Sequence, residues 1–393
     1  MSRSQAILLH IAALVFLGGI LFISARPEIY ATVPVATNQI DQTAGVEITR
    51  AATSSLIAPI ATTTAATSST PAKKPPAKKA PVARSAPRPS SVPVAEQAAT
   101  NQASRIQNPY SFSPFEFSAV NEMTRAALVN ILCIAGSGDM RSITGSGIII
   151  DPRGVILTNA HVAQYVLLSQ SSDVNLSCMI RMGSPAIVRF KAETLYIPPV
   201  WVDAHVAEIR SQHALGTGEH DYALLRIVSS LDGTPLSAPL PYLLTDIREA
   251  IGFEGDSVLA ASYPAEFSVS TQDNVYAASS GTTIKQLLTF DVNSVDLISL
   301  GGVIEAQSGS SGGAVANAWG RLIGIIVTTS EGQTTGQRDL HALTLGYINR
   351  DFTKQTGHPL SELLAGDIAT IASDFNTNIA PILIAKYIGQ LSR

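Results

Sequence analysis

The sequence predicts an all-β domain over residues 109–350. Short apolar runs in this region alternate with clusters of Gly, Pro, Asn and Asp, a spacing typical of antiparallel barrels and sandwiches. Apolar residues make up 46% of the 393-residue chain, which is enough to bury a sizeable core. The strand candidates are residues 127–133, 146–150, 155–158, 176–182, 186–190, 222–228, 258–262, 313–316 and 322–328.

Helices are expected before and after these strands. Ser113-Pro114 is a helix-start signal, because Ser caps the N-terminus and Pro fits the first turn, so a short helix is predicted from there to about Arg125. Leu, Ile and Ala recur at helical spacing from about Pro359 to Leu391. This pattern predicts a C-terminal extension, residues 351–393, that contains one or two helices.

The N-terminus carries a membrane signal. Residues 6–25 are apolar apart from His10 and Ser24, and twenty residues at helical rise match the hydrocarbon thickness of a bilayer. We therefore expect a single transmembrane anchor, with residues 1–5 in the cytoplasm. The competing interpretation is a cleaved signal peptide, for which Ile23-Ser24-Ala25 is a fair cleavage site.

Residues 26–108 are rich in Pro, Ala, Thr and Lys, and this composition predicts a disordered linker. Prolines break helices and there is little apolar surface to bury, so an extended, partly polyproline II chain is expected. The basic stretch from Lys73 to Arg88 is interpreted as a solvated spacer, and contact with anionic cell-wall polymers is the alternative. The net charge of −4 gives no reason to expect a nucleic-acid partner.

Three separated segments carry residues that suit nucleophilic catalysis. His161 stands at the end of an apolar strand pair, Asp221 lies in His220-Asp221-Tyr222, and Ser311 lies in Gly309-Ser310-Ser311-Gly312-Gly313. A serine hydroxyl becomes a nucleophile only when a base removes its proton, and a carboxylate orients that base. The order along the chain is His, Asp, Ser, and glycines flank the serine where the backbone must turn sharply.

Neighbouring residues allow other interpretations. Ser308 and Ser310 are alternative nucleophiles, but only Ser311 is followed directly by two glycines. His213 and His220 could suggest a metal pair, yet no carboxylate or cysteine at ligand spacing supports one. We therefore expect neither a metal nor a cofactor.

The three motifs together resemble the trypsin/chymotrypsin-like serine proteases, and most closely the HtrA-like, trypsin-like peptidase branch. A fourth segment, residues 255–264, resembles the strand that precedes the nucleophile loop in that branch. Two departures are Ser310, where the family usually has Asn, and Ala314, where it usually has Pro. The resemblance implies a chymotrypsin-like fold of two antiparallel β-barrels. We expect the C-terminal helices to pack on the second barrel.

The resemblance also implies roles for the site residues. His161 and Asp221 would come from the first barrel and Ser311 from the second, with an oxyanion hole made by the backbone N–H groups of Gly309 and Ser311. The implied activity is that of a serine endopeptidase that cleaves proteins or peptides and needs no zymogen processing. We expect no peptide-binding PDZ module, so a trimeric assembly is not implied. The rival functions are an inactive protease-like module that binds peptides or a partner, and a structural wall-attachment protein.

Specificity residues follow from the same resemblance. Glu305 lies six residues before Ser311, where trypsin-like enzymes place the acid that binds a basic side chain. Thr328, Thr329 and Ser330 are expected to form one wall of the substrate pocket. His341 is an alternative determinant that would favour acidic side chains, as in glutamyl endopeptidases.

The two cysteines, Cys133 and Cys178, lie in predicted strands of the first barrel. Outside the cytoplasm a disulfide between them is permitted, and we expect one, although two reduced buried thiols are the alternative. Together with the anchor, this predicts a single-pass protein of the cell membrane. Its catalytic domain would lie outside the cytoplasm, in a bacterial envelope.

Overall fold

The structure is a computed structural model, and it describes residues 96–97, 108–136, 140–211, 217–236, 239–265, 274–291, 294–330 and 332–392. The expected anchor, residues 6–25, and nearly all of the linker lie outside the described residues. Within the described ranges, no single helix is long and apolar enough to cross a membrane. The helix pair Ile368–Asn378 and Ala380–Leu391, bent by 44°, meets that test by length and composition only.

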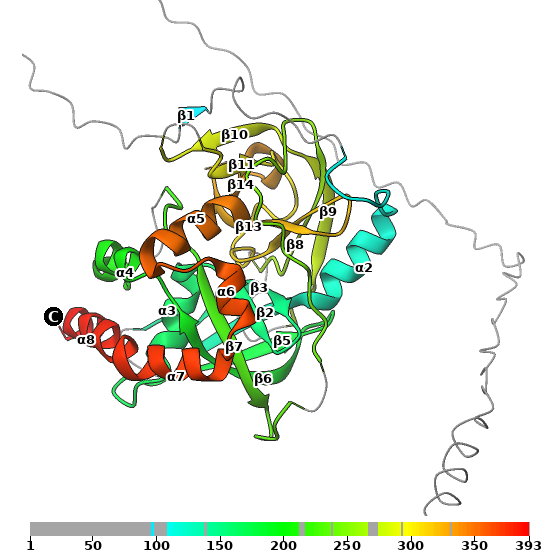
Figure 1. The fold of residues 1–393 in the computed structure, drawn as a ribbon. Helices are drawn as coiled ribbons and strands as arrows, with labels where there is room; N and C mark the ends of the chain where they lie inside the picture. The colour runs from blue at the N-terminus through cyan, green and yellow to red at the C-terminus, as the bar shows by residue number, and fades with distance from the viewer. Residues whose placement is uncertain are drawn as a thin grey trace, which may run out of the picture. The chain divides into compact units, whose positions relative to one another are not determined.

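The first half of the domain is a closed six-stranded antiparallel barrel, as expected (Figure 1). The strands follow the order β2-β3-β4-β7-β6-β5 around the barrel. Their side chains are mostly β-branched or apolar, and all residues of β4 and most of those of β2 and β3 are buried. The six strands are β2 (Leu128–Ala135), β3 (Ile143–Asp151), β4 (Val155–Thr158), β5 (Leu176–Met182), β6 (Ile187–Tyr196) and β7 (Ala223–Ser230).

The second half is an antiparallel sheet in the order β1-β10-β11-β14-β13-β12-β8-β9, and not the second closed barrel that we expected. The strands are β1 (Glu96–Gln97), β8 (Ser257–Ser262), β9 (Ala278–Thr283), β10 (Gln286–Thr289), β11 (Leu297–Ser299), β12 (Ala314–Asn317), β13 (Leu322–Thr329) and β14 (Leu340–Thr344).

The bend between β9 and β10 explains why this sheet has two ends. The backbone N–H of Ile284 donates to Asp256 O beside β8, whereas that of Lys285 donates to Ser299 O in β11. One bent stretch of chain thus leaves the β8 edge and joins the β11 edge. The sheet curls round through this bend instead of closing by a strand-to-strand ladder, and it encloses its own apolar cluster around Ile298 and Ile326.

The N-terminal helix is present but begins later than predicted. Helix α2 spans Phe117–Ala127, with Glu116 at its N-cap, so Ser113-Pro114 does not start it. The backbone N–H of Phe115 instead donates to Ala318 O at the end of β12. The chain before α2 is therefore held in an extended form along the second half, where proline is also favourable.

Six further α-helices lie in the described part of the domain. They are α3 (Ala160–Leu168), α4 (Pro199–His205), α5 (Leu345–Thr356), α6 (Leu360–Ala365), α7 (Ile368–Asn378) and α8 (Ala380–Leu391), and two short 3-10 turns lie at Val206–Glu208 and Thr335–Gln337. The expected boundary between residues 350 and 351 falls inside α5.

The C-terminal helices pack on the first barrel, which corrects the expectation that they cover the second. Helix α7 lies against β6 and α8 against α3 (Figure 1). The Asn376 side chain donates to Thr194 O at 2.9 Å, and the Phe375 ring packs beside the Tyr196 ring. Tyr196 stands at the end of β6, and its ring contacts Phe352 of α5 and Phe375 of α7, which gives both helices an aromatic contact on this barrel.

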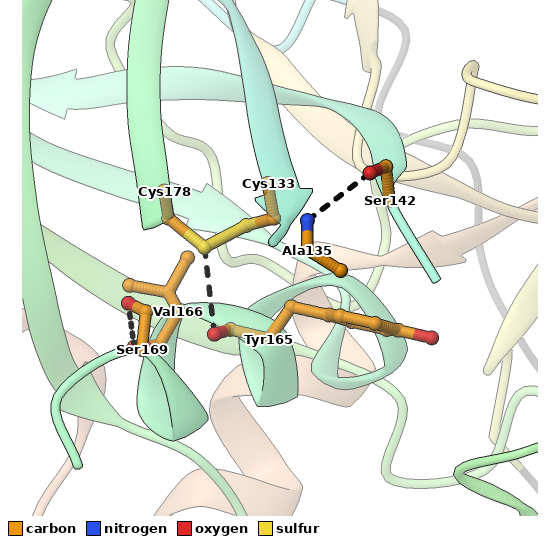
Figure 2. Close-up of a disulfide and its surroundings, with 7 residues drawn as sticks. All are labelled: Cys133, Ala135, Ser142, Tyr165, Val166, Ser169 and Cys178. Carbon is orange, nitrogen blue, oxygen red and sulfur yellow. Dashed lines mark hydrogen bonds between the residues drawn. A yellow bond between two sulfur atoms is a disulfide. The ribbon is translucent and has the colours of Figure 1, made fainter. Parts of the chain in front are cut away.

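A disulfide joins Cys133 and Cys178, as expected. The two residues face each other in the β2–β5 ladder, with 4.1 Å between their Cα atoms. Figure 2 shows the bridge above helix α3, where the Cys178 sulfur contacts Tyr165 O. The bridge therefore fastens two neighbouring strands of the first barrel next to the helix that carries His161.

Candidate active site

His161 lies in the first turn of α3, just after the end of β4. Strand β4 ends at Thr158 and α3 begins at Ala160, so His161 carries one of the unpaired N–H groups at the start of a helix. Asn159 occupies the N-cap position without capping α3. Its side-chain amide instead donates to Asp221 O at 2.8 Å, which ties the start of α3 to the Asp221 turn.

Asp221 arrives beside His161 because of the register between β4 and β7. Thr158 is paired with Ala223, so residues just after β4 and just before β7 lie together. The His161 ring contacts the Asp221 carboxylate at 2.6 Å through Nδ1 and Oδ2. The backbone N–H of His161 also donates to Asp221 Oδ1 at 2.9 Å. One carboxylate thus orients the imidazole and satisfies the helix terminus that carries it.

The electrostatics of this pair suit a general base. The side chain of His161 is 21% exposed and that of Asp221 is 9% exposed. Burial lowers the pKa of His161, but the adjacent Asp221 carboxylate raises it by charge and by hydrogen bonding, and the net effect is a raised pKa. The Asp221 carboxylate also fixes the proton on Nδ1, which leaves Nε2 as the acceptor in the neutral ring.

Ser311 lies on the loop between β11 and β12, in the second half, and it is partly exposed. The alternative Ser310 is 1% exposed, and its hydroxyl accepts a hydrogen bond from Ser262 at 2.9 Å. Burial therefore removes Ser310 from the candidates. Ser308 is exposed, and its backbone oxygen accepts from the N–H of Ala265.

Ser146 of β3 joins the Ser311 loop to the first barrel. Its backbone N–H donates to Ser311 O at 2.8 Å, and its hydroxyl donates to Gly309 O at 2.7 Å. The same hydroxyl accepts from the N–H of Tyr263, at the end of β8. The loop is thereby held on both sides and lies against the strand pair that ends in His161.

Two glycines shape this loop. Gly309 and Gly312 both have a positive φ, 89° and 83°. A Cβ on Gly312 would lie 2.1 Å from Ser146 O and 2.4 Å from Thr158 Oγ1, so a larger residue would force the loop away from the first barrel. Thr158 lies three residues before His161, so this contact also shows how closely the Ser311 loop approaches the histidine.

The backbone N–H groups of Gly309 and Ser311 donate no hydrogen bond within the described part of the chain. Two such groups in one tight turn can bind a negatively charged oxygen. Over the same residues, no hydrogen bond joins Ser311 to His161. The structure therefore brings together His161 and Asp221 directly, and brings the Ser311 loop next to them through Ser146 and Thr158.

The specificity candidates lie in the second half. Glu305 is fully buried; its Oε1 accepts from the Ser280 hydroxyl at 3.1 Å, and its Oε2 has no hydrogen-bond partner. Burial raises the pKa of Glu305 to about 7, although the Ser280 hydrogen bond opposes this. His341 contacts Asp339 at 3.1 Å.

The expected pocket wall follows β13. The backbones of Thr328 and Thr329 pair with His341 and Leu340 of β14, while their side chains lie outside the described residues. The Ser330 hydroxyl accepts from the N–H of Asp339 at 2.7 Å. The roles of Glu305 and of this wall in binding substrate stay predictions.

Sequence reasoning missed the residues that support the site. Ser146 and Asn159 make hydrogen bonds to the Ser311 loop and to Asp221, and neither was singled out as a site residue. The signal for Ser146 was its position between two strand glycines, which commonly mark a close approach of another backbone. Among the residues that the structure describes, no three His, Cys, Asp or Glu side chains are arranged to hold a metal ion, and His213 lies outside that set.

Comparison with known protein families agrees with the sequence motifs. Residues 145–325 match the family described as Trypsin-like peptidase domain. This match supports a trypsin-like serine protease, and it covers 181 of the 393 residues. No curated protein matches the chain.

A solved structure that resembles the chain is the serine endoprotease from Yersinia pestis. The two are 19% identical, with a TM-score of 0.40, over 62% of this chain and 68% of that chain.

Proposed function

We propose that the protein is a serine endopeptidase that uses Ser311 as nucleophile, His161 as base and Asp221 as the residue that orients the base. The observation that carries this proposal is the doubly hydrogen-bonded His161–Asp221 pair beside a glycine-rich loop whose Ser311 is partly exposed. The family of residues 145–325 supports the same chemistry.

The proposed reaction follows from these positions. Ser311 Oγ forms a bond to the substrate carbonyl carbon while its proton passes to His161 Nε2. The N–H groups of Gly309 and Ser311 bind the developing oxyanion; each such donor contributes about 3 kcal/mol to lowering the barrier. His161 then gives the proton to the leaving amine as the peptide C–N bond breaks. Water, deprotonated by His161, hydrolyses the acyl-enzyme and restores the Ser311 hydroxyl.

Fluorophosphonate labelling of the full-length chain tests this proposal. We expect wild type to be labelled and to cleave peptides, and Ser311→Ala to lose both activities. Ser308→Ala is the matched control, because this exposed serine lies three residues away in the same loop, and it should keep both activities. Labelling that persists in Ser311→Ala, or a folded wild type that binds peptides without turnover, would favour the binding-module alternative.

We also propose that Glu305 selects substrates with a basic side chain before the cleaved bond. Its place six residues before Ser311 supports this, and its unpartnered Oε2 leaves an oxygen without another use. Glu305→Gln should lower kcat/KM for a peptide with arginine there more than for the same peptide with leucine. Equal loss on both peptides would show that Glu305 does not contact the substrate side chain.

We further propose that the domain works outside the cytoplasm, tethered to the membrane by residues 6–25. The Cys133–Cys178 disulfide supports this, because disulfides persist in oxidising compartments. Protease added to intact cells or spheroplasts should digest the domain, and the membrane fraction should contain the uncleaved N-terminus by mass spectrometry. A mature N-terminus near residue 26 would show that the apolar segment is a signal peptide.

A further inference from the structure

The residue before Asp221 has an unusual backbone conformation. His220 has φ of 59°, and it is the one non-glycine residue with positive φ among those that the structure describes. This left-handed conformation costs free energy in any residue with a side chain. The turn is completed by the N–H of Asp221, which donates to Gly218 O at 3.1 Å. Something must therefore hold this turn, and the turn sets where the Asp221 carboxylate points.

Helix α5, which follows β14 of the second half, holds the turn at two points. Asp351 Oδ2 lies 2.9 Å from His220 Nδ1. The hydroxyl of Tyr347, one helical turn earlier, accepts the backbone N–H of His220 at 2.9 Å. Side chains four residues apart lie on one face of a helix, so α5 presents both groups to the same turn.

Asp351 is a buried carboxylate with several hydrogen-bond donors around it. Its side chain is 7% exposed, and besides His220 it accepts hydrogen bonds from the Tyr222 hydroxyl at 3.0 Å and from the Gln355 amide. Tyr222 follows Asp221 directly, so Asp351 contacts the residues on both sides of Asp221. Burial raises the pKa of Asp351, but the hydrogen bond and the charge of His220 lower it by more. The net effect is a lowered pKa.

We propose that Asp351 and Tyr347 of α5 hold the turn at His220 and thereby position Asp221 against His161. The inference rests on the proposed function, since it assigns positioning residues to the same site. His220, Asp351 and Tyr347 touch no reacting atom. They act on Asp221 through its two chain neighbours, His220 and Tyr222. A misplacement of a reacting group by about 1 Å costs about 100-fold in rate.

The pair also gives the rate a second dependence on pH. The pKa of His220 is raised, because the opposing effect of burial is outweighed by Asp351 and Glu219. The groups that face His220 are the Asp351 carboxylate, the Tyr347 hydroxyl and the more distant Lys354 on α5, and Glu219 in its own turn at 3.6 Å. When His220 loses its proton, the charged pair is lost and the turn is held less firmly. We therefore expect kcat/KM to fall on the alkaline side as His220 deprotonates.

The test compares three variants of the full-length protein. Asp351→Asn removes the charge, Tyr347→Phe removes one hydroxyl and keeps the ring packed on Phe290, and His220→Asn keeps a donor and tolerates the left-handed backbone. We expect Asp351→Asn to lower kcat/KM by about 10- to 100-fold, mainly through kcat. Tyr347→Phe should lower it less. His220→Asn also lacks the charged pair, so its rate should already be lowered at neutral pH, and the alkaline fall should disappear.

His358→Asn is the matched control. His358 also pairs with a carboxylate, that of Glu362 at 2.9 Å, but its side chain is 64% exposed and lies outside the site. The control should leave rate and pH profile unchanged. Thermal melts of each variant separate misfolding from misplacement, and the downfield proton resonance of His161 Nδ1–H reports directly on its bond to Asp221.

The outcomes are distinguishable from those of the proposed function. If wild type fails to label with fluorophosphonate, the protease proposal fails. If wild type labels, and folded Asp351→Asn and Tyr347→Phe keep wild-type kcat and an unchanged His161 resonance, the positioning role is wrong. An alkaline fall that persists in His220→Asn would likewise overturn the second pH dependence.

Discussion

At the scale of single residues, Asp221 performs two tasks with one carboxylate. Oδ2 contacts the His161 ring, and Oδ1 accepts the backbone N–H of the same residue. In Asp221→Asn, one oxygen can still accept the backbone N–H, but the amide then faces Nδ1 and favours the wrong tautomer. We expect kcat to fall by about 10⁴-fold with little change in fold.

The pH profile of that variant provides a second readout. The proposed mechanism needs neutral His161, so wild-type activity should appear as the pH rises through the raised pKa of His161. Without the carboxylate the acidic limb of the residual activity should move to lower pH. The stability of the fold changes with pH in the opposite direction to activity. The His161–Asp221 pair stabilises the fold most below about pH 6.5, the pKa of histidine in the unfolded chain, and this contribution is lost as the pH rises through the raised pKa of His161. An acidic limb that does not move in Asp221→Asn would assign it to another group.

Glu305 gives a prediction about stability. Its pKa is about 7 in the folded domain against 4.5 for an ordinary glutamate, so the folded state binds the extra proton between these values. Stability should therefore fall as the pH rises from about 4.5 to about 7, by roughly 3 kcal/mol in all. Glu305→Gln should remove this slope and be relatively more stable at pH 8. Urea unfolding at several pH values measures this slope in the free energy of unfolding, and Glu362→Gln, at an exposed glutamate, is the control. A slope that survives in Glu305→Gln would contradict the prediction.

At the scale of elements, the sequence predicts strands and motifs better than how they are joined. The six strands of the first barrel and the placement of His161 follow from local patterns of apolar and turn residues. The bend at Ile284–Lys285 does not, because it depends on hydrogen bonds to Asp256 and Ser299, which are distant in sequence. The start of α2 was misplaced for the same reason: Phe115 bonds to Ala318, a partner that no local signal reveals.

The β2–β5 pair is fastened by the disulfide, and this gives a prediction at the same scale. The bridge closes a loop of 45 residues, which in the chain-entropy model stabilises the fold by up to about 4 kcal/mol. The double change Cys133→Ala with Cys178→Ala should lower the free energy of unfolding by about 2–4 kcal/mol while cleavage at 25 °C is retained. Reductant should destabilise wild type by a similar amount and leave the double variant unaffected. Equal stability of the two proteins without reductant would show that the bridge contributes nothing.

At the scale of the whole molecule, the C-terminal helices join the two halves of the domain. Helix α5 begins directly after β14 of the second half and ends against Tyr196 and the His220 turn of the first. Helix α7 continues along β6, and Arg153, after β3, donates to Gly366 O just before α7. The helical pattern after residue 359 was predictable from the sequence. Its docking surface was not, because the aromatic face on β6 is formed only when the barrel closes.

This arrangement predicts that the C-terminal helices unfold together with the first barrel. Phe375 of α7 is 5% exposed and packs beside Tyr196, so Phe375→Ala removes a buried ring and should cost about 3 kcal/mol. If the helices are part of the barrel's cooperative unit, one thermal transition should shift as a whole, and amide exchange should speed up in β6 as well as in α7. Exposed Ile382→Ala on α8, at 61% exposure, is the control and should change little. Faster exchange confined to α7, with β6 and the main transition unchanged, would mean that these helices are a separate layer. In that case the contacts from α5 to the His220 turn would have to hold without support from the helices that follow α5.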